Sequence, residues 1–220
     1  MELGVGLAEG MAAVVSADAR RVVFIGDSIT DAGRDRADPG SFGDGYVSLL
    51  APELIAAGST VRNLGIAGDK ARDLAARWER ELLPAAPQLL TVYVGVNDMW
   101  RRFDSDDPTS ADEFTQTLRP LLESVVAQHA PQLVLMEPYF LPVCDEQHAW
   151  LDDLDGKRAA VRALAADFGA ALVPLYEVFS AEASARPVAE LAPDGVHPTP
   201  LGSRLIADAW RAVAPISDSR

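Results

Sequence analysis

Cysteine is almost absent from this sequence, and basic residues are scarce. The 220 residues include one cysteine, Cys144, and 19 Lys or Arg against 33 Asp or Glu, which gives a formal net charge of -14. One thiol cannot form an internal disulfide, so we expect a reducing compartment. Nucleic acids and anionic membrane surfaces both need a basic protein surface, so the acidic balance argues against either partner. A neutral small-molecule substrate fits this composition better.

Long apolar runs and a basic amino terminus are also missing. No apolar run approaches the length that spans a membrane, and residues 1–20 are small, apolar and acidic, without the early Lys or Arg of a secretory signal. We therefore expect a cytoplasmic protein with no membrane partner. Residues 1–20 are predicted to be a flexible extension, with Met11 as an alternative translation start. The rest of the chain is predicted to form one domain, residues 21–214, and a C-terminal tail, residues 215–220.

Strand-like segments alternate with segments of helical periodicity along the chain. The predicted strands cover residues 21–25, 60–64, 89–94, 133–136 and 171–175. The predicted helices cover residues 46–57, 70–82, 111–125, 151–168 and 200–213, with loops at 31–44, 95–108 and 139–147. This alternation predicts an α/β fold, a flavodoxin-like three-layer α/β/α sandwich around a five-stranded parallel sheet.

The first strand leads into Gly26-Asp27-Ser28. Ser28 therefore follows the carboxyl end of a buried strand, at the edge of the sheet where open α/β proteins carry out chemistry. Taken alone, the tripeptide is more typical of an ordinary turn. The observation that favours catalysis lies far along the chain, in Asp194-Gly195-Val196-His197.

A serine hydroxyl needs a neighbouring base, usually an imidazole whose other nitrogen is held by a carboxylate. The chain has three histidines. His129 lies near a helix end, where its favourable interaction with the helix dipole is a sufficient reason for a histidine. His148 lies in a polar segment without an obvious partner. His197 alone has a carboxylate close by, Asp194, across a glycine turn. Ser28, His197 and Asp194 are therefore the candidate catalytic triad.

Acyl transfer also needs hydrogen-bond donors for the oxyanion. Three candidates follow neighbouring strands: the backbone N–H of Ser28, the backbone N–H of Gly65 and the side-chain amide of Asn97. Turn flexibility explains Gly65 equally well, and loop chemistry explains Asn97 equally well.

Four sequence blocks in order resemble the SGNH, or GDSL, hydrolases. They are Gly26-Asp27-Ser28, Gly65 after the second strand, Gly95-Val96-Asn97-Asp98 after the third, and Asp194-Gly195-Val196-His197-Pro198 near the end. The resemblance implies an SGNH hydrolase fold and a serine esterase without metal or cofactor. It also implies a triad of Ser28, Asp194 and His197, with Ser28, Gly65 and Asn97 in the oxyanion hole.

Five segments are similar to the intracellular bacterial acetylxylan esterases of this superfamily: 26–34, 45–47, 61–66, 72–79 and 97–101. This similarity implies a homo-oligomer that removes acetyl groups from short xylo-oligosaccharides. That branch carries a Trp before the catalytic aspartate, where this chain has Pro193.

Candidate substrate-binding residues surround these blocks. Met99 and Trp100 are placed to wall an acyl pocket and Tyr139 to line the sugar side, and plain packing explains each of these three equally well. Asp27, beside the nucleophile, is the fourth candidate. The alternative functions are a lysophospholipase, a thioesterase or an arylesterase of the same superfamily, and a non-catalytic carbohydrate-binding relative. A nucleotide-binding domain is disfavoured because the segment at Asp27 lacks a glycine-rich cradle and would repel phosphate.

Overall fold

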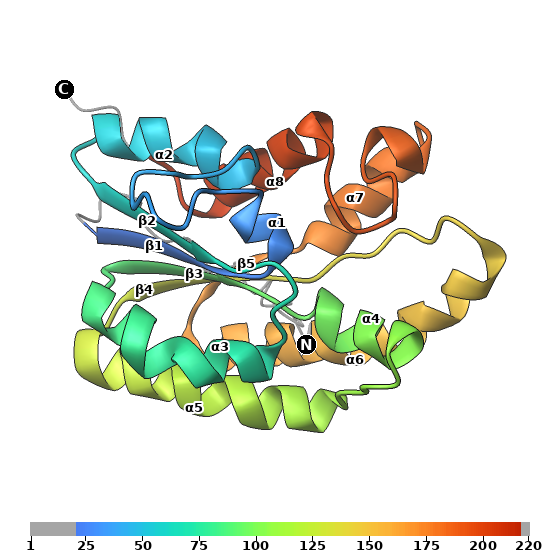
Figure 1. Ribbon diagram of the computed structural model, residues 1–220, viewed down its shortest axis with the longest axis horizontal. Helices are drawn as coiled ribbons and strands as arrows, with labels where there is room; N and C mark the ends of the chain where they lie inside the picture. Colours follow the sequence, from blue (N-terminus) through green and yellow to red (C-terminus); the bar gives the residue numbers. More distant parts are fainter. Residues whose placement is uncertain (1–20, 217–220) are drawn as a thin grey trace, which may run out of the picture.

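Among residues 21–216, which this computed structural model describes, five strands form one parallel sheet (Figure 1). The strands are β1 (Arg21–Gly26), β2 (Thr60–Gly65), β3 (Leu89–Tyr93), β4 (Gln132–Met136) and β5 (Ala171–Val173), in the order β2-β1-β3-β4-β5. This is the flavodoxin-like order, so the predicted α/β class and five-stranded parallel sheet are confirmed. The predicted extension 1–20 and positions 217–220 of the predicted tail lie outside the described residues.

Helices cover both faces of the sheet, which gives the predicted three layers (Figure 1). One face carries α1 (Ser28–Asp31), α2 (Tyr46–Ala56), α7 (Leu175–Ala183) and α8 (Pro200–Val213). The other carries α3 (Ala71–Arg77), α4 (Val96–Asp104), α5 (Ala111–His129) and α6 (Leu151–Phe168). A π-helical turn (Trp78–Leu82) and short 3-10 segments (Leu83–Ala85, Asp145–Trp150, Val188–Glu190) complete the elements.

The apolar run of β1 fills two cores at once. Val22 and Phe24 belong to the cluster on the α2 and α8 side, whereas Val23 and Ile25 belong to the cluster under α3, α5 and α6. Successive side chains of a strand point to opposite faces, so a central strand between two helical layers must be apolar throughout. This burial fixes the strand end that leads into Ser28.

Three helices differ from the sequence predictions, and the first is α1, which was not predicted and ends at Asp31 in the predicted loop 31–44. Helix α4 occupies part of the segment predicted as the loop 95–108. Helix α7 begins at Leu175, a position predicted to belong to the fifth strand, because that strand ends at Val173 and Pro174 occupies the position before the helix. Proline has no backbone N–H for a strand ladder, which explains the early end of β5.

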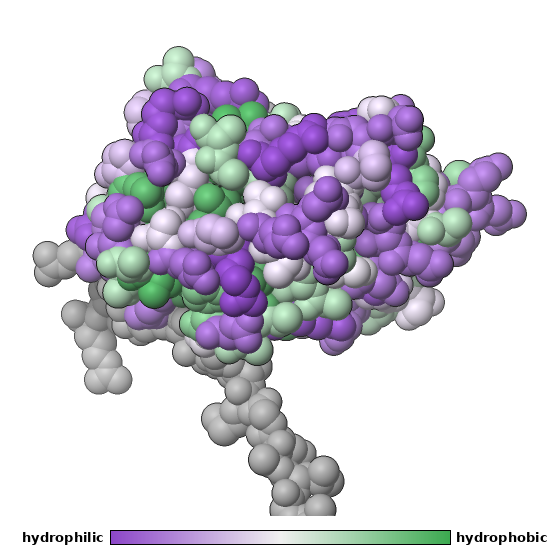
Figure 2. Space-filling model, turned by 90° about the horizontal axis from the view of Figure 1, so that it is seen from below, coloured by the Kyte–Doolittle hydropathy of each residue, from purple (hydrophilic) through white to green (hydrophobic). Residues whose placement is uncertain are grey.

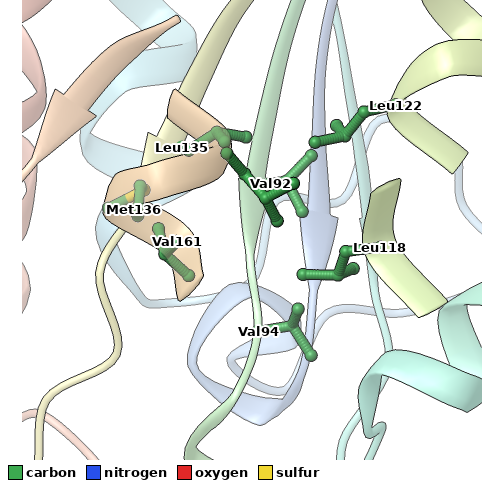
Figure 3. A pocket seen from close by; sticks show the side chains of 8 residues that line it. Val92, Val94, Leu118, Leu122, Leu135, Met136 and Val161 are labelled. Carbon is green, nitrogen blue, oxygen red and sulfur yellow. The ribbon is translucent and has the colours of Figure 1, made fainter. Parts of the chain in front are cut away.

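A void of about 10 Å³ lies between the sheet and helices α5 and α6 (Figure 3). Its lining is entirely apolar: Val92, Val94, Leu118, Leu122, Leu135, Met136, Val161 and Leu164. A void of this size without polar partners holds neither an ordered water nor a substrate, so it is a packing gap.

The face formed by α3, α5 and α6 is largely hydrophilic, with hydrophobic residues scattered over it (Figure 2). Across residues 21–216, none of the helices combines the length and the apolar character needed to span a bilayer.

Candidate active site

Ser28 is the first residue of α1, directly after β1. Asp27 caps this helix: its Oδ1 accepts a hydrogen bond from the Ile29 N–H at 3.0 Å. The N–H groups in the first turn of a helix have no acceptor within that helix, so the Ser28 N–H is available to a ligand. Helices α1 and α4 follow β1 and β3, two neighbouring strands, at the same edge of the sheet (Figure 1).

Ser28 lies beside the histidine selected from the sequence. Its Oγ is 2.8 Å from His197 Nε2, and His197 Nδ1 is 2.6 Å from Asp194 Oδ2. Ser28 and His197 are 169 positions apart in the sequence, and the fold brings both of them together with Asp194. A hydroxyl, an imidazole and a carboxylate linked in this order can activate the hydroxyl as a nucleophile.

A tight turn holds Asp194 against His197. Asp194 Oδ1 accepts the N–H groups of Val196 at 2.9 Å and His197 at 2.7 Å. Gly195 has a φ of +84°, and a Cβ there would lie 2.2 Å from the Leu141 carbonyl oxygen, so the turn requires glycine. Partial burial alone would raise the pKa of Asp194, but the hydrogen bonds from His197 and Val196 lower it overall. The carboxylate beside His197 therefore stays ionised.

The other two histidines are positioned differently. His129 Nε2 lies 2.8 Å from the Leu83 carbonyl oxygen, and His148 is exposed in the 3-10 segment before α6. Of the three, only His197 contacts a serine hydroxyl. Among residues 21–216, no group of three or more His, Cys, Asp or Glu side chains is arranged to hold a metal ion.

Asn97 lies in the first turn of α4 and is 3% exposed. Its Nδ2 donates one hydrogen bond to the Asp69 carbonyl oxygen at 3.1 Å, which ties α4 to the loop after β2. An amide nitrogen has two hydrogens, so the second can serve a ligand.

Gly65 does not offer the N–H predicted from the sequence. Its N–H donates to Asn63 Oδ1 at 2.8 Å, and its carbonyl accepts two hydrogen bonds from Arg34. Glycine is required here for another reason: a Cβ would lie 2.2 Å from the backbone nitrogen of Asp31. The role of Gly65 is thus close packing of β2 against α1.

The following loop, 66–69, has one unused donor. The Ile66 N–H donates to the Gly26 carbonyl, the Ala67 N–H to Asp31, and the Asp69 N–H to the Ile66 carbonyl. Within the described residues, the Gly68 N–H has no acceptor, and Gly68 is exposed. The signal that could have identified it is the second glycine of Gly65-Ile66-Ala67-Gly68.

Asp31 and Arg34 clamp this loop to α1. Asp31 Oδ2 accepts the Ala67 N–H at 2.9 Å and pairs with Arg36 at 2.5 Å, and Arg34 Nε and Nη2 lie 3.1 and 2.9 Å from the Gly65 carbonyl oxygen. Burial lowers the pKa of Arg34, and the Asp31 charge opposes this effect. The clamp fixes the Gly68 segment relative to Ser28.

Three predicted substrate-binding residues are buried instead. Asp27 is wholly buried as the cap of α1, and Met99 is wholly buried in the core. Tyr139 is also buried; its hydroxyl donates to the Val196 carbonyl at 2.6 Å and supports the turn that carries His197. Of the four, only Trp100 borders the site: it is partly buried, and its ring centroid is 6.0 Å from that of His197.

A cavity of about 190 Å³ opens beside Ser28 and His197. The rest of its lining is Ile29 and Asp44 together with small or proline residues: Ala32, Gly45, Pro198, Pro200 and Ser203. Sequence reasoning missed Asp44, although it lies at the end of the loop expected over the site. Its carboxylate has no ion pair among the described residues.

This fold and site define the class of α/β carboxylic ester hydrolases. The chain belongs to the GDSL-like lipase/acylhydrolase family, whose sequence profile matches residues 24–205. The resemblance to the SGNH, or GDSL, hydrolases is therefore confirmed.

Known relatives cover nearly the whole chain. An acetylxylan esterase from Geobacillus stearothermophilus is 32% identical over 86% of this chain and 91% of its own. The crystal structure of Axe2, an acetylxylan esterase from the same organism, has a TM-score of 0.84, at 30% identity over 94% and 99% of the two chains. A putative GDSL-like lipase from Parabacteroides merdae has a TM-score of 0.83 at 32% identity, covering 89% and 95%.

The structures of the Geobacillus esterase include variants of individual residues. Those described as catalytic mutants replace a serine, an aspartate or a histidine by alanine, and the aspartate and histidine are three positions apart. Another variant, described as an acetyl-xylooligosaccharide esterase, replaces the tryptophan immediately before that aspartate.

Proposed function

We propose that this enzyme is a serine esterase that removes acetyl groups from carbohydrates such as acetylated xylo-oligosaccharides. The single observation that carries the proposal is the linked contact from Ser28 Oγ through His197 to Asp194, at 2.8 and 2.6 Å. The acetylxylan esterase relative supports the choice of acyl group and sugar. Its mutated aspartate and histidine have the same spacing as Asp194 and His197.

The reaction proceeds in two steps. His197 Nε2 takes the proton of Ser28 Oγ as that oxygen attacks the ester carbonyl, and then delivers it to the sugar oxygen as the bond from the carbonyl carbon to that oxygen breaks. Water attacks the resulting acetyl-serine, with His197 again as the base, and releases acetate. Asp194 keeps the proton-bearing Nδ1 oriented and stabilises the imidazolium.

The negative charge on the carbonyl oxygen needs fixed donors. We assign this role to the N–H groups of Ser28 and Gly68 and to Asn97 Nδ2. The hydrogen bonds of the loop after β2 support this assignment. The Gly65 N–H already donates to Asn63, whereas the Gly68 N–H has no acceptor among the described residues.

Lysophospholipase and thioesterase activities remain the alternatives within the family, together with arylesterase activity. Asp44 in the cavity beside Ser28 and the net charge of -14 both disfavour a phosphate-bearing substrate. Pro193 stands where the Geobacillus esterase has its tryptophan, so the surface next to Asp194 differs between the two. The cytoplasmic location, the homo-oligomer and the single-domain division stay predictions.

The test compares hydrolysis of p-nitrophenyl acetate, p-nitrophenyl octanoate and acetylated xylo-oligosaccharides by wild type and Ser28→Ala. We expect acetate release from the sugar and from the short aryl ester, and a loss of at least about 10³-fold in kcat for Ser28→Ala. A preference for octanoate would point to a lipid or thioester substrate. Equal activity of both proteins would overturn the serine mechanism.

A further inference from the structure

Helix α4 carries two aromatic residues one turn apart, outward from the catalytic histidine. Trp100 lies beside His197, and Phe103 follows three positions later. Residues three apart on a helix are neighbours on its surface, with Cβ atoms roughly 5–6 Å apart. The helix that carries Asn97 in its first turn therefore extends an aromatic strip away from Ser28 and His197.

Phe103 is unusually exposed for a phenylalanine. It is 40% exposed, although its ring lies flat against Trp150, with centroids 4.8 Å apart and planes 7° apart. Trp150 in turn stacks on Phe140, which is wholly buried, at 5.5 Å. Phe103 is thus the outermost ring of a stack anchored in the core, and leaving that ring in water costs hydrophobic free energy.

Charged pairs border the aromatic strip, and their guanidinium groups lie over the two rings at cation–π distance. The guanidinium of Arg101 lies 5.8 Å from the Trp100 ring and pairs with Asp104. That of Arg102 lies 5.9 Å from the Phe103 ring and pairs with Asp153 at 2.8 Å. These pairs offer both donors and acceptors while adding no net charge. An aromatic surface with such a border suits a neutral ligand that has apolar faces and hydroxyl edges.

We infer that Trp100 and Phe103 form a binding strip for sugar rings next to the one that bears the acetyl group. Pyranose rings present C–H groups on their faces, which pack on the electron-rich face of an aromatic ring, and hydroxyls at their edges, which bond to charged groups. The inference rests on the proposed function for the reacting sugar. It adds that the enzyme binds a neutral oligosaccharide chain and prefers it to a single acetylated sugar.

The measured quantity is the ratio of kcat/KM for acetylated xylo-oligosaccharides to kcat/KM for p-nitrophenyl acetate, as a function of chain length. We expect the wild-type ratio to rise with chain length, and Phe103→Ala to lower it about tenfold for the longer chains, mainly through KM. Phe103→Trp, which keeps an aromatic face, should retain the rise. Ile55→Ala removes a side chain of similar exposure, 48%, on α2 and should leave the ratio unchanged.

A binding measurement separates this inference from the proposed chemistry. Calorimetric titration of Ser28→Ala with deacetylated xylohexaose should give binding that the added Phe103→Ala change weakens about tenfold. Loss of Ser28 dependence in hydrolysis would overturn the serine mechanism but not sugar binding. Equal chain-length profiles and equal xylohexaose affinities with and without Phe103 would overturn the strip. If Phe103→Ala altered only the oligomeric state, the binding strip would also be overturned, because Trp100 and Phe103 would then form a contact between copies of the chain.

Discussion

The carboxylate of Asp31 accepts the backbone N–H of Ala67 at 2.9 Å, and this bond joins the helix that begins with Ser28 to the loop that contains Gly68. Two of the three proposed oxyanion donors sit on these separate segments. The relative position of these two donors therefore depends on Asp31, whose side chain takes no part in the contacts among Ser28, His197 and Asp194. Asp31 is in this sense a positioning residue.

Replacing Asp31 by Ala should lower kcat on p-nitrophenyl acetate by about 10- to 100-fold, because a small displacement of an oxyanion donor weakens transition-state stabilisation. KM should change little. Asp31→Asn keeps an oxygen for the Ala67 N–H and loses only the ion pairs with Arg36 and Arg34, so it should retain most of the activity. Equal kcat for Asp31→Ala and Asp31→Asn would contradict the role of this hydrogen bond.

Asn97→Ala should reduce kcat by about 10²- to 10³-fold, the usual effect of losing one oxyanion donor, with a small change in KM. The affinity for a boronic acid, which forms a tetrahedral adduct with the active serine, should fall in parallel. Steady-state kinetics and inhibition measurements check both. If kcat fell without any loss of boronate affinity, the amide would serve only to hold the Asp69 carbonyl.

The fold and the candidate triad follow from local patterns. Buried strands, capped helices and a lone Asp-supported histidine leave their mark in short stretches of sequence, which is why β1, α5 and the pair Asp194 and His197 were predictable. Ser110, for example, caps α5 through a capping box with Glu113, as its sequence indicates.

Side-chain direction and donor use were not predictable in the same way. The predicted loop 95–108 would let Met99 and Trp100 line one pocket wall. In helix α4, however, successive side chains point about 100° apart, so Met99 lies in the core while Trp100 contacts His197. Likewise, no local pattern shows that Asn63 already occupies the Gly65 N–H. These facts depend on contacts between distant segments.

Asp27 should make the folding stability fall as the pH rises. Burial, opposed by the Ile29 N–H and reinforced by the charges of Asp98 and Asp69, raises the pKa of Asp27 from 3.8 to about 7. Between these values the folded state holds a proton that the unfolded state has lost. The protonated Asp27 thus stabilises the folded state fully below pH 3.8. This stabilisation decreases as the pH rises and is lost above about pH 7.

Asp27→Asn has no proton to lose, so its stability should fall less than that of the wild type between pH 4 and pH 8. The difference should be on the order of 4 kcal/mol. Burial likewise raises the pKa of Asp98 to about 6, but Asp98 is present in both proteins, so the comparison isolates Asp27. Urea unfolding at several pH values measures the difference. Parallel curves for the two proteins would show that Asp27 ionises normally in the fold.

Tyr139→Phe should destabilise the protein by about 1–3 kcal/mol and lower kcat several-fold without raising KM for any ester. The lost hydroxyl leaves the Val196 carbonyl without its 2.6 Å bond in a buried position, between Asp194 and His197. Tyr93→Phe is a matched control, since the Tyr93 hydroxyl is buried and has no hydrogen-bond partner within the described residues, and its loss should cost nothing. Thermal unfolding and kinetics of both variants check the contrast. A raised KM for sugar esters at full stability in Tyr139→Phe would instead return Tyr139 to the substrate-binding surface.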